Sequence, residues 1–95
     1  MWEKLVDAIE RKQVVKTKEM LRQSPEQVVA KNYQDETLLH FAAKAGDFDM
    51  AEFLLTRKAD VNIRNDGGQT ALDVADGQGG KDKLRELYRK HGLAR

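Results

Sequence analysis

The 95-residue chain contains no cysteine and only one proline, Pro25. The lack of cysteine excludes a disulfide framework, a catalytic thiol and a cysteine-ligated zinc site. The sequence also lacks any apolar run near the roughly 20 residues that a membrane-spanning helix needs, and its N-terminal residues lack the apolar segment of a signal peptide. We therefore expect a soluble, cytoplasmic protein that does not interact with a membrane.

The sequence has little net charge, +1, but the charges are unevenly placed. Six basic residues face four acidic ones in 1–22, five face ten in 23–80, and six face two in 81–95. Solvated outer faces on terminal helices explain such a pattern. An acidic centre between basic ends would also suit a basic partner or head-to-tail self-association.

The chain repeats itself at a spacing of 33 residues. The segment 37–46, TLLHFAAKAG, reappears as TALDVADGQG at 70–79. An offset of 34 aligns Ala8-Ile9, Val14 and Met20-Leu21 with apolar residues of the middle copy. A period near 33 is typical of a turn followed by two short antiparallel helices, a unit that cannot bury its apolar face alone. We expect an all-α stack of three helix-turn-helix units.

The middle copy resembles the ankyrin repeat. It reads Thr-Leu-Leu-His-Phe-Ala-Ala at 37–43, then Gly46, an apolar helix, and Lys-Ala-Asp-Val-Asn at 58–62. The resemblance implies an ankyrin-repeat solenoid that occupies the chain as a single domain. Its repeats would lie at about 1–31, 32–64 and 65–95, with short β-hairpin-like fingers.

Two departures from the family pattern concern the backbone. Asp35 and Lys58 stand where the family prefers glycine. Because Asp tolerates a positive φ better than most residues, the turn at 32–36 should survive. Lys58 is expected to strain the end of the middle repeat if that position is left-handed.

Apolar residues at helical spacing predict six helices, near 2–11, 13–22, 38–45, 48–57, 71–77 and 81–91. We expect the core of the middle unit to be filled by Phe48, Met50, Phe53, Leu54 and Leu55, and 77–80 to form a loose corner. In the last helix only Leu84, Leu87 and Tyr88 are apolar, so its outer face is polar, as in a terminal repeat. This favours a complete small protein or a C-terminal module.

The histidines and two aspartates are the candidate catalytic or metal-binding residues. His40 and Asp73 occupy the same repeat position, and Asp76 lies near, so a small enzyme or ligand-binding protein using these residues is one alternative. In ankyrin repeats the Thr and His of this motif are structural, and the resemblance implies that His40 ties its turn to a neighbour. Two histidines, His40 and His91, without cysteine do not predict a metal site, and we expect no cofactor.

A glycine-rich segment and a basic helix raise the question of phosphate or nucleic-acid binding. The segment 77–81, GQGGK, lacks the spacing and the following Ser or Thr of a phosphate-binding loop, and a turn explains it. The last helix is basic, but Tyr88 is expected to point inward and no aromatic stacking surface accompanies the charge. Nucleic-acid binding is therefore not favoured.

The remaining hypothesis is a non-enzymatic adaptor or inhibitor that binds a protein partner. By resemblance to the family, the contact positions lie on finger tips and exposed positions of the first helices: Arg11, Tyr33, Gln34, Glu36, Lys44, Ala45, Arg57, Asp66, Gln69 and Gln78. Tyr33 is the strongest candidate, because aromatic side chains dominate interface energetics, unless it folds back over the first repeat. Trp2 is expected to cover the edge of that repeat.

Two further expectations remain open. The chain could instead be a packing module for a neighbouring domain or for a copy of itself. The resemblance also permits hydroxylation of Asn62, which matches a hairpin asparagine of some ankyrin repeats.

Overall fold

The computed structural model describes residues 2–93, which form helices and no strands. The elements, in order, are α1 (Trp2–Glu10), α2 (Val14–Gln23), the 3-10 helix η1 (Pro25–Val29), α3 (Leu38–Ala45), α4 (Phe48–Thr56), α5 (Ala71–Val74) and α6 (Gly77–Lys90). This is the all-α architecture expected from the repeat spacing.

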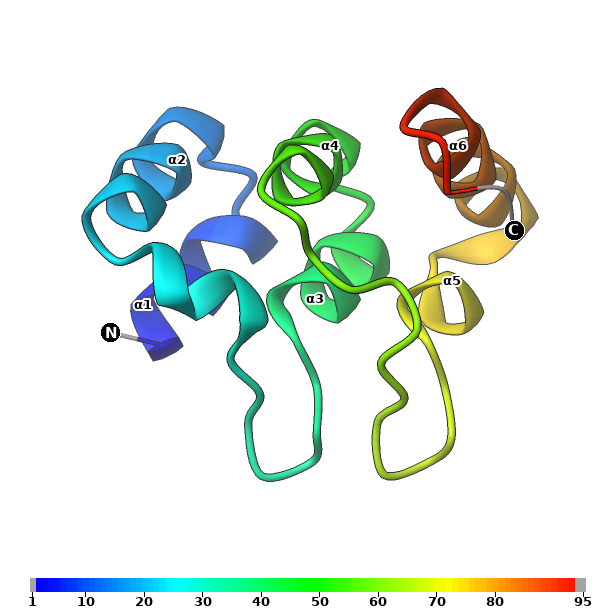
Figure 1. Cartoon of the computed structure of the whole chain (residues 1–95), viewed down its shortest axis with the longest axis horizontal. Helices are drawn as coiled ribbons and strands as arrows, with labels where there is room; N and C mark the ends of the chain where they lie inside the picture. Colours follow the sequence, from blue (N-terminus) through cyan, green and yellow to red (C-terminus); the bar gives the residue numbers. More distant parts are fainter. Residues whose placement is uncertain (1, 94–95) are drawn as a thin grey trace.

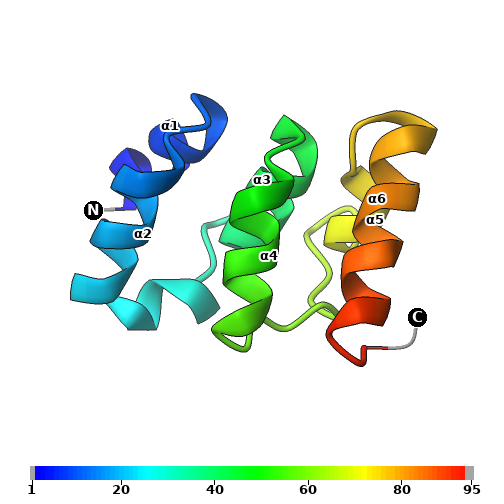
Figure 2. The ribbon, with the colours of Figure 1, turned by 90° about the horizontal axis from the view of Figure 1, so that it is seen from above.

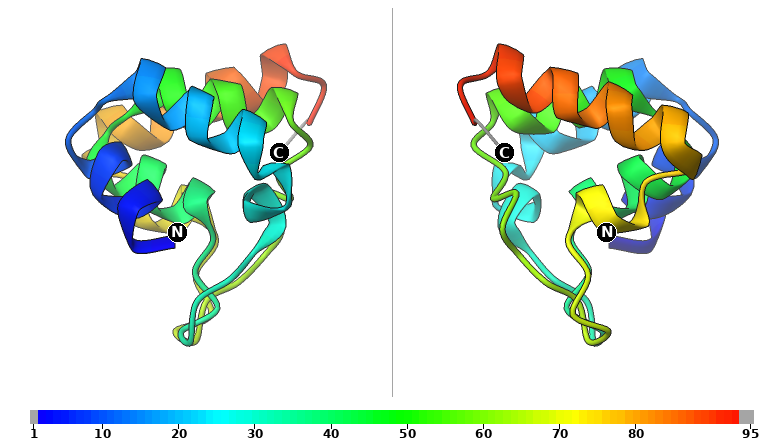
Figure 3. Two further views of the ribbon diagram at one scale, coloured as in Figure 1. Left: turned by 90° about the vertical axis from the view of Figure 1, so that its left-hand side faces the viewer. Right: turned by 90° about the vertical axis from the view of Figure 1, so that its right-hand side faces the viewer.

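Three helix pairs stand side by side in two layers. Helices α1, α3 and α5 make one layer and α2, α4 and α6 the other, as Figures 1 and 2 show. The loops before α3 and α5 project from the same edge of the stack (Figure 3). We call residues 32–36 the first finger and residues 65–69 the second finger. The stack is the solenoid that the sequence predicted, although the repeat boundaries stay predictions.

Four helices end with the same backbone turn. A residue with positive φ follows the last turn of α1, α3, α4 and α6: Lys12, Gly46, Lys58 and Gly92. In each case its amide donates to the carbonyl three residues back, and the next amide donates to the carbonyl five residues back. This is the Schellman motif, which favours glycine. The expected strain at Lys58 (φ 70°) is thus present, and Lys12 (φ 57°) shares it.

The last helix pair differs from the sequence expectation. Helix α5 ends at Val74 rather than near residue 77, and the segment 77–80, expected to be a loose corner, is the first turn of α6. The cause is an extended backbone at Ala75 (ψ 145°), after which the Asp76 amide donates to the Ala43 carbonyl of α3 (3.3 Å). Gly77 then starts α6 with a φ of 68°.

The core lies between the layers and between neighbouring pairs. It is built mainly from the fully buried large side chains Leu5, Ile9, Leu38, Leu39, Met50, Leu54, Leu84 and Tyr88, with Ala42 and Ala43 where helices approach closely. Met50, Leu54 and Leu55 are buried as expected, whereas Phe48 and Phe53 are only partly buried and pack against the core, so for these two the expectation was wrong. Phe53 instead lies between two cations, the Lys18 ammonium at 5.3 Å and the Arg57 guanidinium at 5.0 Å from its ring centre.

Candidate functional site

The two fingers have the same hydrogen-bonded construction. In the first finger, Asn32 Oδ1 accepts from the amides of Gln34 and Glu36, both at 2.9 Å. In the second finger, Asn65 Oδ1 accepts from the amides two and four residues further on, at 2.9 and 3.0 Å. The residue before the last position has positive φ in both, Asp35 at 59° and Gly68 at 75°. The turn at 32–36 therefore survives without glycine, as expected.

Hydrogen bonds also join one finger to the other. The Asp66 amide donates to the Gln34 carbonyl at 2.9 Å. His40, which is 1% exposed, accepts from the Thr37 amide at Nδ1 (3.1 Å), and its Nε2 lies 2.9 Å from the Gln69 carbonyl oxygen. Because an amide can only donate and a carbonyl can only accept, these contacts assign the neutral tautomer with the proton on Nε2. His40 thus ties its own turn to the next finger, as the resemblance implied.

Asp73 repeats only half of that arrangement. Its Oδ2 accepts from the Thr70 amide at 3.0 Å, and its own amide donates to the Thr70 hydroxyl at 3.3 Å, which closes a capping box. The bond from the Thr70 amide is the main reason why the pKa of Asp73 lies below its usual value. Asp76 precedes α6, where its exposed side chain makes no capping hydrogen bond to another described residue. His40 and Asp73 are therefore both occupied in starting helices.

Two expected contact residues bond to each other. Glu36 is 8% exposed and accepts from Lys44 Nζ at 2.9 Å and from Asn32 Nδ2 at 3.1 Å. Burial alone would raise the pKa of Glu36, but the bonds from Lys44 and Asn32 outweigh it and the pKa lies below its usual value. Lys44 Nζ also stands 4.7 Å from the ring centre of Phe41. Glu36 is thus part of the frame and offers a partner little surface.

The other expected contact residues lie at the surface. Tyr33 is fully exposed, at 104% of its reference area, so it does not fold back over the first repeat. Ala45 is half-buried, whereas the remaining members are exposed: Arg11, Gln34, Arg57, Asp66, Gln69 and Gln78. The fingers bring Gln34 and Asp66 together, whereas Tyr33 lies beside Trp2 and Asn32. Arg57 lies apart from them in the other layer, against Phe53.

A cleft between α1 and α3 was not predicted. It has a volume of about 210 Å³ and is lined by Trp2, Glu3, Val6, Asp7, Glu10 and Phe41. The Trp2 and Phe41 rings meet edge to face, with centroids 6.2 Å apart and planes at 75°. Trp2 and Glu3 also line a second hollow with Lys31, Asn32 and Tyr33. Trp2 therefore shapes two hollows beside the first finger and faces the second repeat through Phe41.

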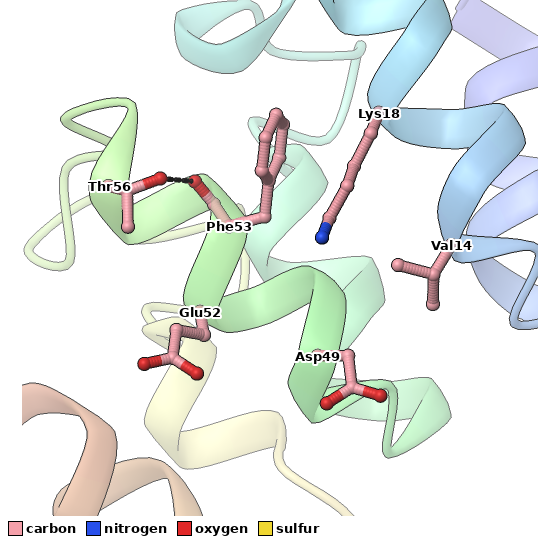
Figure 4. A pocket seen from close by; sticks show the side chains of 6 residues that line it. All are labelled: Val14, Lys18, Asp49, Glu52, Phe53 and Thr56. Atoms are coloured by element: carbon pink, nitrogen blue, oxygen red, sulfur yellow. Dashed lines mark hydrogen bonds between the residues drawn. The ribbon is translucent and has the colours of Figure 1, made fainter.

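A second groove runs between α2 and α4, in the layer away from the fingers. Its lining consists of Val14, Lys18, Asp49, Glu52, Phe53 and Thr56. Lys18 extends from α2 toward α4, as Figure 4 shows, and its ammonium lies 5.3 Å from the ring centre of Phe53. One cation and two carboxylates share this open groove, so no single charge dominates it.

Metal binding and membrane crossing are two further classes of site to consider. Within residues 2–93, no group of three or more His, Cys, Asp or Glu side chains is placed to hold a metal ion. None of the helices in this part of the chain is both long and apolar enough to cross a membrane.

A ladder of equivalent helix pairs, with fingers bonded edge to edge, defines a helical solenoid protein. The family model described as "Ankyrin repeats (many copies)" matches residues 20–75 of the chain. The chain belongs to the ankyrin repeat family.

Two curated proteins carry similar segments. The chain is 37% identical over 75 residues to the serine/threonine-protein kinase VIK of Arabidopsis thaliana. The matched segment covers 79% of this chain and 17% of the kinase. It is 59% identical over 34 residues to the probable E3 ubiquitin-protein ligase XBOS33 of Oryza sativa subsp. japonica. This matched segment covers 36% of this chain and 6% of the ligase. The similarity thus spans less than a fifth of each relative.

Proposed function

We propose that this chain is a non-enzymatic interaction module, an adaptor or inhibitor, that binds a protein partner through its fingers and the exposed side of its first-layer helices. The observation that carries the proposal is the fully exposed Tyr33 on a finger whose backbone is fixed by Asn32 and by the bond from the Asp66 amide to Gln34. A fixed backbone lowers the ordering cost of binding, and an exposed aromatic side chain supplies contact area.

The alternative of an enzyme built on His40, Asp73 and Asp76 has less support. Both nitrogens of His40 are engaged, one with Thr37 and one with the Gln69 carbonyl. Asp73 is engaged with Thr70 at the start of α5. A general acid or base works best in a site that perturbs its pKa and excludes water, and His40 has no nitrogen left for a substrate while Asp73 is exposed at the surface.

The test is affinity purification of partners from cells with the wild-type chain and two matched variants. Tyr33→Ala removes the exposed aromatic of the first finger, and Val15→Ala removes an apolar side chain that is 83% exposed on α2. We expect a specific partner to be lost by Tyr33→Ala and kept by Val15→Ala, with circular dichroism confirming that both variants fold. Equal retention by both variants would contradict the proposal.

Self-association is the second candidate, motivated by the basic segment 81–95 and the acidic segment 23–80. Light scattering over a range of concentrations decides it. A concentration-dependent dimer that salt disperses would favour it, and a monomer throughout would leave the partner-binding proposal in place.

A further inference from the structure

The cleft between α1 and α3 joins apolar walls to an acidic rim. Trp2 and Val6 lie four residues apart on α1 and share a face with Glu3, Asp7 and Glu10. Residues three and four apart are neighbours on a helix surface, so the apolar pair and the three carboxylates form adjacent stripes. Phe41 of α3 supplies the opposite wall.

The charges around the cleft leave a net negative potential. The lining of the cleft holds these three carboxylates and no cation. Two neighbouring cations are paired, Arg11 with Asp7 at 3.1 Å and Lys44 with Glu36 at 2.9 Å. Lys31, which lines the adjoining hollow with Trp2 and Glu3, is the one cation there that joins no ion pair with another described residue. Glu3 and Glu10 join no ion pair with another residue of the described part. A negative surface attracts positively charged partners and repels acidic ones.

The cleft continues into the first finger. Trp2 and Glu3 line both this cleft and the hollow formed with Lys31, Asn32 and Tyr33. Aromatic side chains therefore follow one another from Phe41 through Trp2 to the exposed Tyr33. An apolar side chain of a partner can pack against any ring of this strip, with the carboxylates of α1 beside it.

We infer that the Trp2, Val6 and Phe41 cleft receives a basic segment of a partner protein. One large apolar side chain of that segment enters the cleft, and its lysine or arginine side chains pair with Glu3 and Glu10. The inference rests on the proposed function and specifies the chemistry of the partner. A volume of about 210 Å³ suits one large side chain, and the excess of carboxylates at the rim selects the sign of its neighbours.

The experiment uses the only tryptophan of the chain as its reporter, since Trp2 forms a wall of the cleft. A random peptide library displayed on phage is selected against the folded 95-residue chain. Selected peptides that lack tryptophan are synthesised, and their binding is followed by Trp2 fluorescence. We expect basic peptides with at least one large apolar residue, a change in Trp2 emission on binding, and a Kd that rises with salt.

A matched pair of variants tests the rim. Glu3→Lys combined with Glu10→Lys reverses two charges at the cleft, and we expect the Kd of the selected peptides to rise about tenfold or more. Glu26→Lys combined with Glu86→Lys makes the same change at exposed positions away from the cleft, and we expect less than about a twofold change. All four positions are exposed, so both double variants should fold.

Several results would overturn the inference. Acidic or neutral peptides, binding without any change at Trp2, or equal effects of the two double variants would each do so while leaving partner binding by the fingers intact. A dimer in light scattering that Glu3→Lys with Glu10→Lys disperses would show that a second copy fills the cleft, which also contradicts the inference. If no peptide is selected, the inference fails, and the Tyr33→Ala purification then decides whether the proposed function fails with it.

Discussion

The middle and the last helix pair start from the same sequence motif and end with different structures. Thr37 with His40 and Thr70 with Asp73 both form capping boxes, 33 residues apart. His40 is buried because the second finger lies beside it, whereas Asp73 is exposed. Helix α3 has eight residues and its counterpart α5 has four. The residue at this motif position is therefore buried and structural where a neighbouring helix pair covers it, and exposed where none does.

The largest expected effect on stability comes from removing, one at a time, the side chains of His40 and Asp73, the third residues of α3 and α5. His40→Ala leaves the Thr37 amide and the Gln69 carbonyl without their partner, and we expect a loss of about 2–4 kcal/mol in the free energy of unfolding. Asp73→Ala removes an exposed cap and should cost only about 1 kcal/mol. Urea unfolding followed by circular dichroism measures both, and equal losses would refute the difference drawn between the two pairs.

The next effect concerns the last residue of each finger, Glu36 and Gln69. The pKa of Glu36 is lowered in the folded chain, so its contribution to stability is present above the ordinary value of 4.5 and is lost as the pH falls through the lower folded value. Glu36→Gln should cost about 1–2 kcal/mol at pH 7 and should flatten the loss of stability on acidification.

Gln69→Glu is the matched control, since this position is exposed and makes no bond to a lysine among residues 2–93. Its unfolding free energy at pH 7 should stay within about 0.5 kcal/mol of the wild type. Unfolding curves of the wild type, Glu36→Gln and Gln69→Glu at pH 7 and at several pH values below 4.5 measure this difference. Parallel pH dependence of the wild type and Glu36→Gln would contradict the assigned role.

A smaller effect, of opposite sign, is expected where lysine occupies a left-handed position. Lys12→Gly and Lys58→Gly should each stabilise the chain by about 0.5–1 kcal/mol, because glycine adopts a positive φ without steric cost. Gly46→Ala, at the same point of α3, should destabilise it by about 1 kcal/mol. Thermal unfolding compares these three variants with Lys58→Ala, and a gain from Lys58→Ala equal to that from Lys58→Gly would show that backbone strain is not the cause.

The smallest effect is expected at Tyr88, which lies 33 residues after Leu55 and is 2% exposed. Its hydroxyl finds no hydrogen-bond partner among residues 2–93, and burial, with the charge of Asp73, raises its pKa above the usual value. Tyr88→Phe should therefore leave the free energy of unfolding unchanged or raise it by up to about 1 kcal/mol. A loss above that size in urea unfolding would show that the hydroxyl is bonded in solution.

The sequence predicted the helix pairs because the 33-residue period and the Thr caps are local signals. It placed α3 at its observed bounds and the limits of α1, α2 and α4 within one residue. It missed the boundary between α5 and α6, since four residues containing three glycines read as a turn although they begin a helix. There, the bond from the Asp76 amide to α3 decides the path of the chain, and that contact is not local.

The candidate site was less accessible from the sequence for the same reason. The exposure of Tyr33 follows from its place on a finger, but the burial of Glu36 depends on Lys44 and on the neighbouring finger. The cleft at Trp2 requires α1 to pack against α3, so that residues 2 and 41 meet. Features that depend on a single repeat could be predicted from the sequence, whereas features that depend on the packing of two repeats could not.

The most direct test of the account is amide chemical-shift mapping by NMR with a bound partner segment. If the fingers and the first-layer helices form the recognition surface, the largest shifts should fall on Tyr33, Gln34 and Asp66 and on the Trp2 indole. Shifts confined to the groove between α2 and α4 around Phe53 would contradict it.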